Sequence, residues 1–337
     1  MSSLTDDINP RVEFEARQPQ GAGLYLFDLD DTIVYRGSHI SDRVLRALGR
    51  ASEAGIVCSI ASGRPLCLVN KKILARKIFP YAVCANGSKV YDLTDGSVIY
   101  SASMDTSLAL AAFHAVEPLR PAWNAFIGDR AYFEWKGTSY MVTGLVGRDA
   151  RQRARSEATG DGGATARRSV ARKALSVFLR GARFFVRKVS NPSTSQVFDI
   201  KPVLRKSPAV DKMGASFKDG ATCDKGVEIL AADGRFEVAR MGMREIEITR
   251  KGVTKATGAL ALMDHLGIDP KDTVAFGDGG NDLPLAEVTG AFVAVANADA
   301  DVKAKATYVC PSIKEDGVAV WIEDRLAASG RTMDGTE

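Results

Sequence analysis

The stretch Leu24-Tyr25-Leu26-Phe27-Asp28-Leu29-Asp30-Asp31-Thr32 decides the fold, because a short apolar run ends abruptly in acidic residues. Four consecutive apolar residues before a polar turn predict a strand buried on both faces, as in a parallel sheet. Ligands of open parallel sheets bind beyond the carboxyl ends of such strands. If the strand extends to Asp30, the side chains of Asp28 and Asp30 project to the same side of the sheet.

Two neighbouring carboxylates repel each other unless a cation lies between them. A hard divalent cation such as Mg²⁺ is the natural partner of such a pair. A solvated acidic turn is an equally good interpretation of this stretch by itself. The choice between the two depends on what stands at the other strand ends.

The composition is that of an ordinary soluble protein of 337 residues, long enough for two domains. Lys and Arg number 45 and Asp and Glu 41, so the formal net charge of +4 is weaker than expected for a dedicated nucleic-acid-binding protein. The five cysteines are scattered without CxxC spacing, which predicts a reducing compartment and no zinc site. With no apolar run of membrane-spanning length and no signal-peptide core, we expect a cytoplasmic protein.

Strands and helices alternate from Leu24 to Gly87. Apolar runs at 56–61 and 81–84 predict two more buried strands, with helices expected after Ser41 and over 66–78. This order predicts an α/β fold with a doubly wound parallel sheet. The alternation returns near the C-terminus, where helices and strands are expected at 255–267, 273–276, 291–295 and 318–328.

The pattern between these two parts predicts an inserted α+β domain. It begins with a hairpin over 89–92 and 97–100, and continues with short strands such as 131–135, 184–186 and 196–200. The expected division is a flexible leader at 1–23, a core domain at 24–87 and 245–328, an inserted domain at 88–244, and a tail at 329–337.

An arginine-rich segment, Arg148–Lys173, stands apart within the inserted domain. Its charge and glycine content predict a flexible insertion. Its arginines could instead contact phosphate or nucleic acid.

Seven motifs follow one another along the chain. They are FDLDDTI (27–33), IASGRP (60–65), ANG (85–87), EITRKGVTK (247–255), FGDGGND (276–282), NA (297–298) and EDGVA (315–319). In content and order they resemble the haloacid dehalogenase-like superfamily, and within it the Cof-type sugar phosphatases of class IIB. The resemblance covers both parts of the expected core domain and is weak between them. It implies a Rossmann-like core, with the inserted α+β domain acting as a cap.

The resemblance also implies roles for the acidic residues. Asp28 would be the nucleophile that forms an aspartyl-phosphate intermediate, and Asp30 the general acid and base. Mg²⁺ would be held by the Asp28 carboxylate, the Asp30 backbone carbonyl and Asp278. Asp282 would orient water or Lys255.

Polar residues at the other strand ends would bind the substrate. By resemblance, Ser62 and Lys255 contact the transferring phosphoryl group, with Asn281 beside them. Gly63 belongs to the same loop, and Arg64 either reaches the substrate or pairs on the surface. Taken singly, Ser62-Gly63 fits an ordinary turn and Lys255 a solvated helix start, while Asn86-Gly87 fits a structural turn better than a ligand.

The resemblance therefore implies a Mg²⁺-dependent phosphatase acting on a small phosphorylated metabolite, most simply a sugar phosphate. A phosphomutase of the same fold is the alternative, because Asp30 is compatible with both reactions. A non-catalytic binding protein and a nucleic-acid binder are the rivals from other classes. Asp31 departs from the pattern, since many Cof-type members have glycine there, and it adds negative charge near the site.

Overall fold

Strand β1 (Leu24–Phe27) lies in the interior of an eight-stranded sheet, and all four of its residues are buried. The computed structural model describes residues 23–35, 39–137 and 192–328. The other strands of this sheet are β2 (Val57–Ala61), β3 (Tyr81–Cys84), β4 (Lys89–Asp92), β5 (Val98–Ser101), β14 (Thr273–Gly277), β15 (Ala291–Val295) and β16 (Tyr308–Cys310).

The strand order is β16-β15-β14-β1-β2-β3-β4-β5. The strands from β16 to β3 are parallel, whereas β4 and β5 are added antiparallel at one edge. The predicted α/β fold with a parallel sheet is thus confirmed. Because β2 and β14 flank β1, their carboxyl ends bring segments more than two hundred residues apart to the edge where Asp28 lies.

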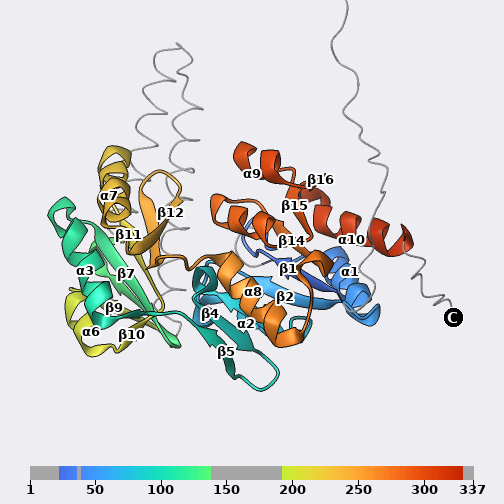
Figure 1. Ribbon diagram of the computed structural model, residues 1–337, viewed down its shortest axis with the longest axis horizontal. Coiled ribbons are helices and arrows are strands. Elements are labelled where there is room, and N and C mark those ends of the chain that lie inside the picture. The colour runs from blue at the N-terminus through green and yellow to red at the C-terminus, as the bar shows by residue number, and fades with distance from the viewer. Residues whose placement is uncertain (1–22, 36–38, 138–191, 329–337) are drawn as a thin grey trace, which may run out of the picture.

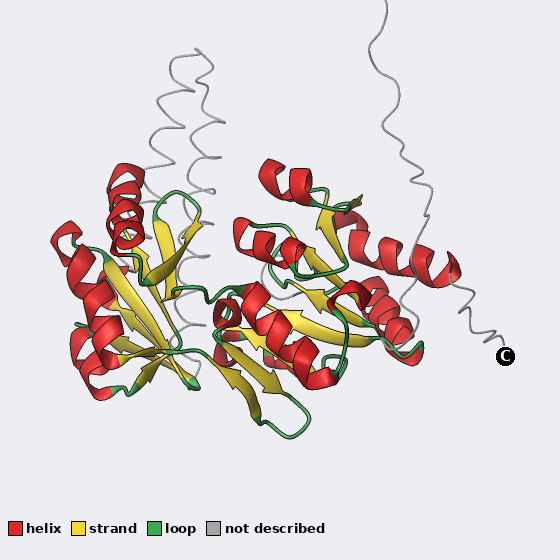
Figure 2. Cartoon of the chain, in the orientation of Figure 1, coloured by secondary structure: helices red, strands yellow, loops and turns green. Residues whose placement is uncertain are grey.

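Helices cover this sheet to form what we name the core lobe (Figures 1 and 2). They are α1 (Asp42–Glu53), α2 (Lys71–Leu74), α8 (Lys255–Leu266), α9 (Ala300–Lys305) and α10 (Gly317–Ala328). Ser41 caps α1 as predicted, since its hydroxyl accepts the Val44 N–H at 3.1 Å. The helix expected over 66–78 is shorter than predicted, because Asn70 caps the short α2 anew and Lys77 adopts φ 55°.

A second lobe, the cap lobe, contains a six-stranded sheet of order β12-β13-β11-β7-β8-β9 and its own hydrophobic cluster. Its strands are β7 (Ala122–Ile127), β8 (Arg130–Glu134), β9 (Thr194–Val197), β11 (Lys212–Ser216), β12 (Phe236–Met241) and β13 (Glu245–Arg250). Its helices are α3 (Thr106–Val116), α6 (Lys201–Lys206) and α7 (Gly220–Asp233). These helices lie on the side of the sheet that faces away from the core lobe (Figure 1).

Both expected domain boundaries need correction. The hairpin of β4 and β5, assigned from the sequence to the inserted domain, extends the core sheet through the pairing of β4 with β3. Strand β13, assigned to the core from residue 245, pairs with β11 and β12 in the cap lobe. Local alternation indicates a strand but not its partner, and pairing over long sequence distances decides which sheet it joins.

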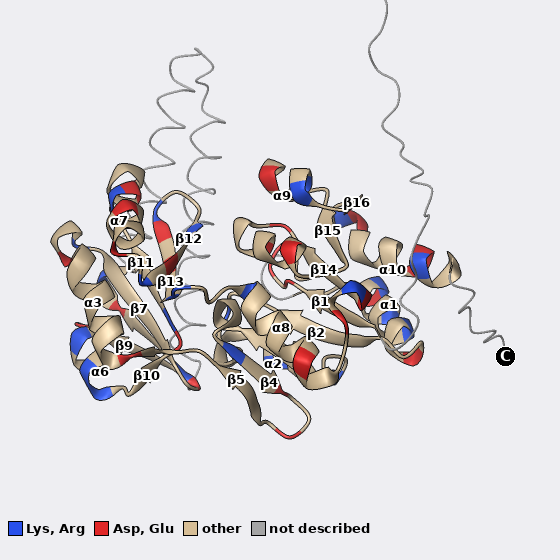
Figure 3. Cartoon of the chain, viewed as in Figure 1, with Lys and Arg blue, Asp and Glu red and all other residues tan. Residues whose placement is uncertain are grey.

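The arginine-rich segment 148–173 and the strand expected at 184–186 lie outside the described residues. Within the described ranges, Lys and Arg alternate with Asp and Glu over both lobes (Figure 3). No helix in that part of the chain is long and apolar enough to span a membrane.

Candidate active site

Asp28 lies directly beyond β1, at the carboxyl edge of the core sheet. Its backbone N–H donates to the Phe276 carbonyl at 3.0 Å, which places it beside the end of β14. The residue is buried, 6% exposed. Strand β1 ends before Asp30, which forms only an isolated bridge with Val34. The two carboxylates therefore have different surroundings instead of sharing one strand face.

Lys255, the first residue of α8, is fully buried against Asp28. Its ammonium donates to Asp28 Oδ1 at 2.5 Å and to Asp282 Oδ1 at 2.6 Å. Burial by itself lowers the pKa of a lysine, but these two carboxylates outweigh it and raise the pKa of Lys255 above its usual value. Lys255 is therefore a charged partner of two acids, which excludes a solvated lysine at a helix start.

The loop after β14 holds the other two acids of the site. Asp282 Oδ2 accepts the backbone N–H groups of Asp278 at 3.0 Å and Gly279 at 3.1 Å. Asp278 Oδ1 accepts the hydroxyl of Thr32 at 3.0 Å. Asp282 thus contacts both Lys255 and the loop that carries Asp278.

The acidic residues of the site fit a divalent cation. Asp28, Asp278 and Asp282 each offer a carboxylate oxygen, and these oxygens lie within 4.8 Å of one another. Burial, with a contribution from Asp282, raises the pKa of Asp278 to about 7, and burial raises that of Asp28 as well. Three crowded carboxylates against one lysine leave excess negative charge, and Mg²⁺ prefers such oxygen ligands. Asp282 belongs to this cluster, whereas the Asp30 carboxylate lies outside it.

Asp30 is instead held by Arg64, from the loop after β2. Arg64 Nε donates to Asp30 Oδ2 at 2.6 Å and Nη2 to Asp30 Oδ1 at 2.5 Å. Both side chains are partly exposed, 31% for Arg64 and 46% for Asp30. From the sequence, Arg64 could either contact the substrate or form an ion pair on the surface. In the structure it is paired with Asp30, the residue predicted to act as general acid and base.

Ser62 is buried in the loop that follows β2. Its N–H donates to the Val83 carbonyl at 2.8 Å, and its hydroxyl accepts the Arg64 N–H at 3.2 Å. The Asn86 N–H donates to the Ser62 carbonyl at 3.3 Å. The Asn86-Gly87 turn approaches the start of α8 so closely that a Cβ on Gly87, at φ 90°, would lie 1.9 Å from the Thr254 carbonyl oxygen. The turn therefore requires glycine.

Asn86 forms a turn, as predicted, and its side chain also takes part in a polar network. Its amide nitrogen donates to Glu247 Oε2 at 2.7 Å, and its amide oxygen accepts Asn281 Nδ2 at 3.3 Å. Glu247 is ion-paired with Lys212, which donates to the Gly63 carbonyl at 2.5 Å. Sequence reasoning assigned no role to Lys212 or Glu247. Glu247 is the first residue of the motif EITRKGVTK (247–255), whereas the sequence around Lys212 contains no motif that would indicate a role.

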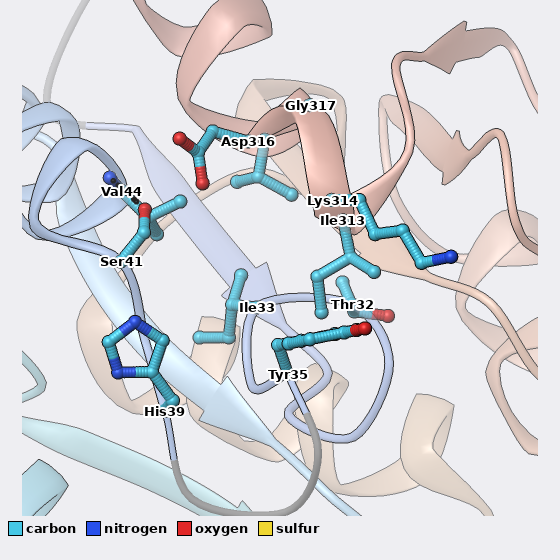
Figure 4. A pocket seen from close by; sticks show the side chains of 11 residues that line it. Thr32, Ile33, Tyr35, His39, Ser41, Val44, Ile313, Lys314, Asp316 and Gly317 are labelled. Atoms are coloured by element: carbon cyan, nitrogen blue, oxygen red, sulfur yellow. Dashed lines mark hydrogen bonds between the residues drawn. The ribbon is translucent and has the colours of Figure 1, made fainter.

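A pocket of about 290 Å³ opens beside Lys255 between the two lobes. Core residues such as Asn281 line one side and β12 and β13 residues such as Arg240 and Thr249 the other. A second pocket, of about 230 Å³, is lined in part by the loop that follows Asp28 (Figure 4). Tyr35, His39 and Lys314 line it together with Thr32. Of the two, the pocket between the lobes is the one that reaches Lys255.

Asp31 adopts φ 59°, a left-handed conformation that aspartate tolerates better than most residues. Its carbonyl accepts the Asn297 side-chain amide at 2.8 Å. This conformation accounts for aspartate at a position where glycine also fits. The carboxylate of Asp31 contributes to the raised pKa of Asp278.

Comparison with curated proteins identifies phosphatases among the relatives. A 5-amino-6-(5-phospho-D-ribitylamino)uracil phosphatase of Bacillus subtilis is 26% identical over 305 residues, which cover 89% of this chain and 96% of that protein. A pyridoxal phosphate phosphatase of Escherichia coli is 23% identical, with 89% and 97% covered. A phosphoglycolate phosphatase of Methanopyrus kandleri is 41% identical over 97 residues, and the chain spans only 41% of its length.

Solved structures share the whole fold at low sequence identity. A sugar phosphatase of haloacid dehalogenase subclass IIB superimposes with a TM-score of 0.67 and 21% identity, covering 90% of this chain and 99% of the other. A haloacid dehalogenase-like hydrolase of Bacillus subtilis gives 0.69 and 20%, with 89% and 99% covered. The family of haloacid dehalogenase-like hydrolases matches residues 25–322. The predicted resemblance is confirmed, and the chain belongs to the haloacid dehalogenase-like hydrolases.

Proposed function

We propose that this protein is a Mg²⁺-dependent phosphomonoesterase acting on a small phosphorylated metabolite. One observation carries the proposal: the buried Asp28 carboxylate, one of a cluster of three, is paired with Lys255, and Lys255 lines a pocket between the lobes. A carboxylate held in place by a fixed cation is suited to attack phosphorus, because the lysine offsets part of its repulsion from an anionic ester.

Asp28 is the nucleophile of the proposed reaction. Its oxygen forms a bond to phosphorus as the bond from phosphorus to the ester oxygen breaks, and Asp30 donates a proton to the departing alkoxide. Water then attacks the aspartyl phosphate, Asp30 takes the proton from that water, and inorganic phosphate leaves. Asp30 is paired with Arg64, whose two-point contact holds the Asp30 carboxylate at the edge of the site.

Fixed donors stabilise the charge on the phosphoryl oxygens. Ser62 and Lys255 have this role, with Asn281 at the edge of the pocket. Asp28 and Asp278, with Asp282 close by and the Asp30 carbonyl, would hold Mg²⁺. Bound Mg²⁺ would supply the positive charge that lets a carboxylate approach a phosphate dianion.

The substrate class follows from the size of the pocket and from the relatives. A space of about 290 Å³ suits a small metabolite rather than a polymer. The relatives described above are named for phosphate esters of small molecules. A sugar phosphate or related polyol phosphate is the substrate we propose.

The test is release of inorganic phosphate from a panel of sugar, polyol and other metabolite phosphates in the presence of Mg²⁺. The unmodified protein should hydrolyse at least one of them, and Asp28→Asn should lose the activity while it remains folded by circular dichroism. Activity retained in Asp28→Asn would refute the proposal. A labelled hexose bisphosphate in the same panel identifies a phosphomutase, since only a mutase keeps the label on the sugar.

A further inference from the structure

Lys212 is a buried lysine of the cap lobe that contacts the core lobe. It is 1% exposed, and the ring centre of Phe126 lies 5.0 Å from its ammonium. The ammonium donates to the Gly63 carbonyl and is paired with Glu247. Burial lowers the pKa of Lys212, which the Glu247 carboxylate opposes. A charge so deeply buried requires compensating partners, because desolvation is costly. Here one of those partners belongs to the opposite lobe.

The Lys212 ammonium contacts the backbone of Gly63, which lies between Ser62 and Arg64 and is tightly packed. A Cβ on Gly63 would lie 2.8 Å from Asn86 Oδ1, 3.3 Å from Asn281 Nδ2 and 3.3 Å from Glu247 Oε2. A shift of Lys212 or Glu247 is therefore transmitted to this loop.

Glu247 extends the contact to a second phosphoryl donor. One of its carboxylate oxygens accepts Lys212 and the other accepts Asn86, which in turn accepts Asn281. The cap residues Lys212 and Glu247 thus touch both the Ser62 loop and the side chain that holds Asn281. Ser62 and Asn281 are the two neutral donors that we assign to the phosphoryl group.

We propose that Lys212 and Glu247 are positioning residues that hold Ser62 and Asn281 in place for the phosphoryl group while the cap lobe lies on the core lobe. The inference rests on the proposed function and goes beyond it. It assigns to two cap residues, of which Glu247 also lines the pocket between the lobes, control over how tightly the core binds a phosphoryl group.

The chain offers a matched control next to Lys212. Asp211 is buried, and its carboxylate is paired at 3.3 Å with Lys89 of β4, so this pair also joins the two lobes. Its other partners are the Ser103 hydroxyl at 2.6 Å and the Gly128 N–H at 2.8 Å. Among the described contacts, none of these reaches the Ser62 loop. Lys89→Met therefore weakens the joint between the lobes without altering the Gly63 contact.

The experiment compares the unmodified protein with the double variant Lys212→Met/Glu247→Leu, which removes both charges so that neither is left buried alone. Orthovanadate, a phosphate-like oxyanion, is the probe. Its inhibition constant, the Mg²⁺ dissociation constant and the melting temperature are measured for each protein. We expect vanadate to bind about 10- to 100-fold more weakly and kcat to fall in parallel. The affinity for Mg²⁺ should stay within about twofold, because the Asp28–Asp278–Asp282 cluster is unchanged.

Lys89→Met should keep its vanadate affinity within about twofold even where its melting temperature falls as far as that of the double variant. If the double variant does not fold, Glu247→Gln, which keeps the volume but removes the charge, is judged by the same criteria. Unchanged vanadate affinity in the double variant, or equal weakening in Lys89→Met, overturns the inference. An unmodified protein that neither releases phosphate nor binds vanadate refutes the proposed function instead.

Discussion

Arg64 and Asp30 form a two-point ion pair at the edge of the candidate active site, with two nitrogen–oxygen distances of 2.6 and 2.5 Å. The guanidinium group thus fixes the orientation of the Asp30 carboxylate. A general acid has to face the leaving oxygen, so the orientation of Asp30 matters most where the leaving group needs a proton.

Arg64→Gln should therefore slow the hydrolysis of alkyl phosphates more than that of p-nitrophenyl phosphate, whose phenolate leaves without protonation. We expect kcat to fall about tenfold or more for a sugar phosphate and much less for the aryl ester. Steady-state kinetics with both substrates measure the ratio. Equal losses on the two esters would show that Arg64 does not act through Asp30.

Lys255→Met should destabilise the protein strongly, because it leaves Asp28 and Asp282 buried without their cation. Breaking a buried pair in this way costs about 3–5 kcal/mol. Urea unfolding measures the change, and Mg²⁺ should restore part of it. The control is Lys271→Met, which removes an exposed pair with Asp269 and should leave the free energy of unfolding nearly unchanged. A similar effect in both variants would contradict the buried-pair explanation.

The stabilisation that Mg²⁺ gives the folded protein should grow with pH. Burial raises the pKa of Asp278 to about 7, whereas an unfolded aspartate titrates near its ordinary value of 3.8. The stability that this group contributes without metal is fully present below that ordinary value and is lost as the pH rises towards 7. Mg²⁺ competes with the bound proton, so its effect increases over the same range.

Melting temperatures with and without saturating Mg²⁺, between about pH 5 and pH 8, test this expectation. The difference should increase with pH in the unmodified protein and be much flatter in Asp278→Asn. A constant difference at every pH would rule out Asp278 as a metal-linked acid.

Gly63→Ala should damage activity more than stability. The added methyl group would lie 2.8 Å from Asn86 Oδ1 and displace the side chains around the Ser62 loop. We expect kcat/KM to fall about tenfold or more. The control is Gly49→Ala within α1, where the added Cβ would have no atom within 4 Å outside the neighbouring turns of its own helix. This substitution should stabilise the helix by about 0.5–1 kcal/mol. Full activity in Gly63→Ala would indicate that the loop adapts without cost.

Local sequence patterns were sufficient to predict the core strands and the polar residues that follow them. The strands before Asp28, Ser62 and Asp278 are apolar except for Ser59 and Thr273, as in strands buried on both faces, and a polar residue follows each strand. In a parallel sheet those ends necessarily lie at one edge. The roles expected of these residues came from the resemblance to the haloacid dehalogenase-like superfamily, and the sheet geometry explains why the residues can meet.

The features of the fold and the site that the sequence did not predict depend on contacts between distant residues. Strand β11 begins with a buried lysine and contains Gly214, so its composition gave no strand signal. The Lys212 contact to Gly63 joins positions 149 residues apart, and only the paired sheets bring them together. The sheet that β4 and β5 join was hidden for the same reason. The partner of Arg64 could not be predicted, because the sequence of a short loop does not determine which carboxylate the arginine side chain reaches.

The position of β1 between β2 and β14 has a consequence during synthesis of the chain. Asp28 is synthesised before Lys255, which pairs with it and with Asp282, and both of these residues are added more than two hundred residues later. Until then β1 lacks its β14 neighbour, and one of its edges can pair with other exposed strands. The nascent chain should therefore keep one edge of β1 exposed until β14 is made, and the candidate active site can assemble only after that.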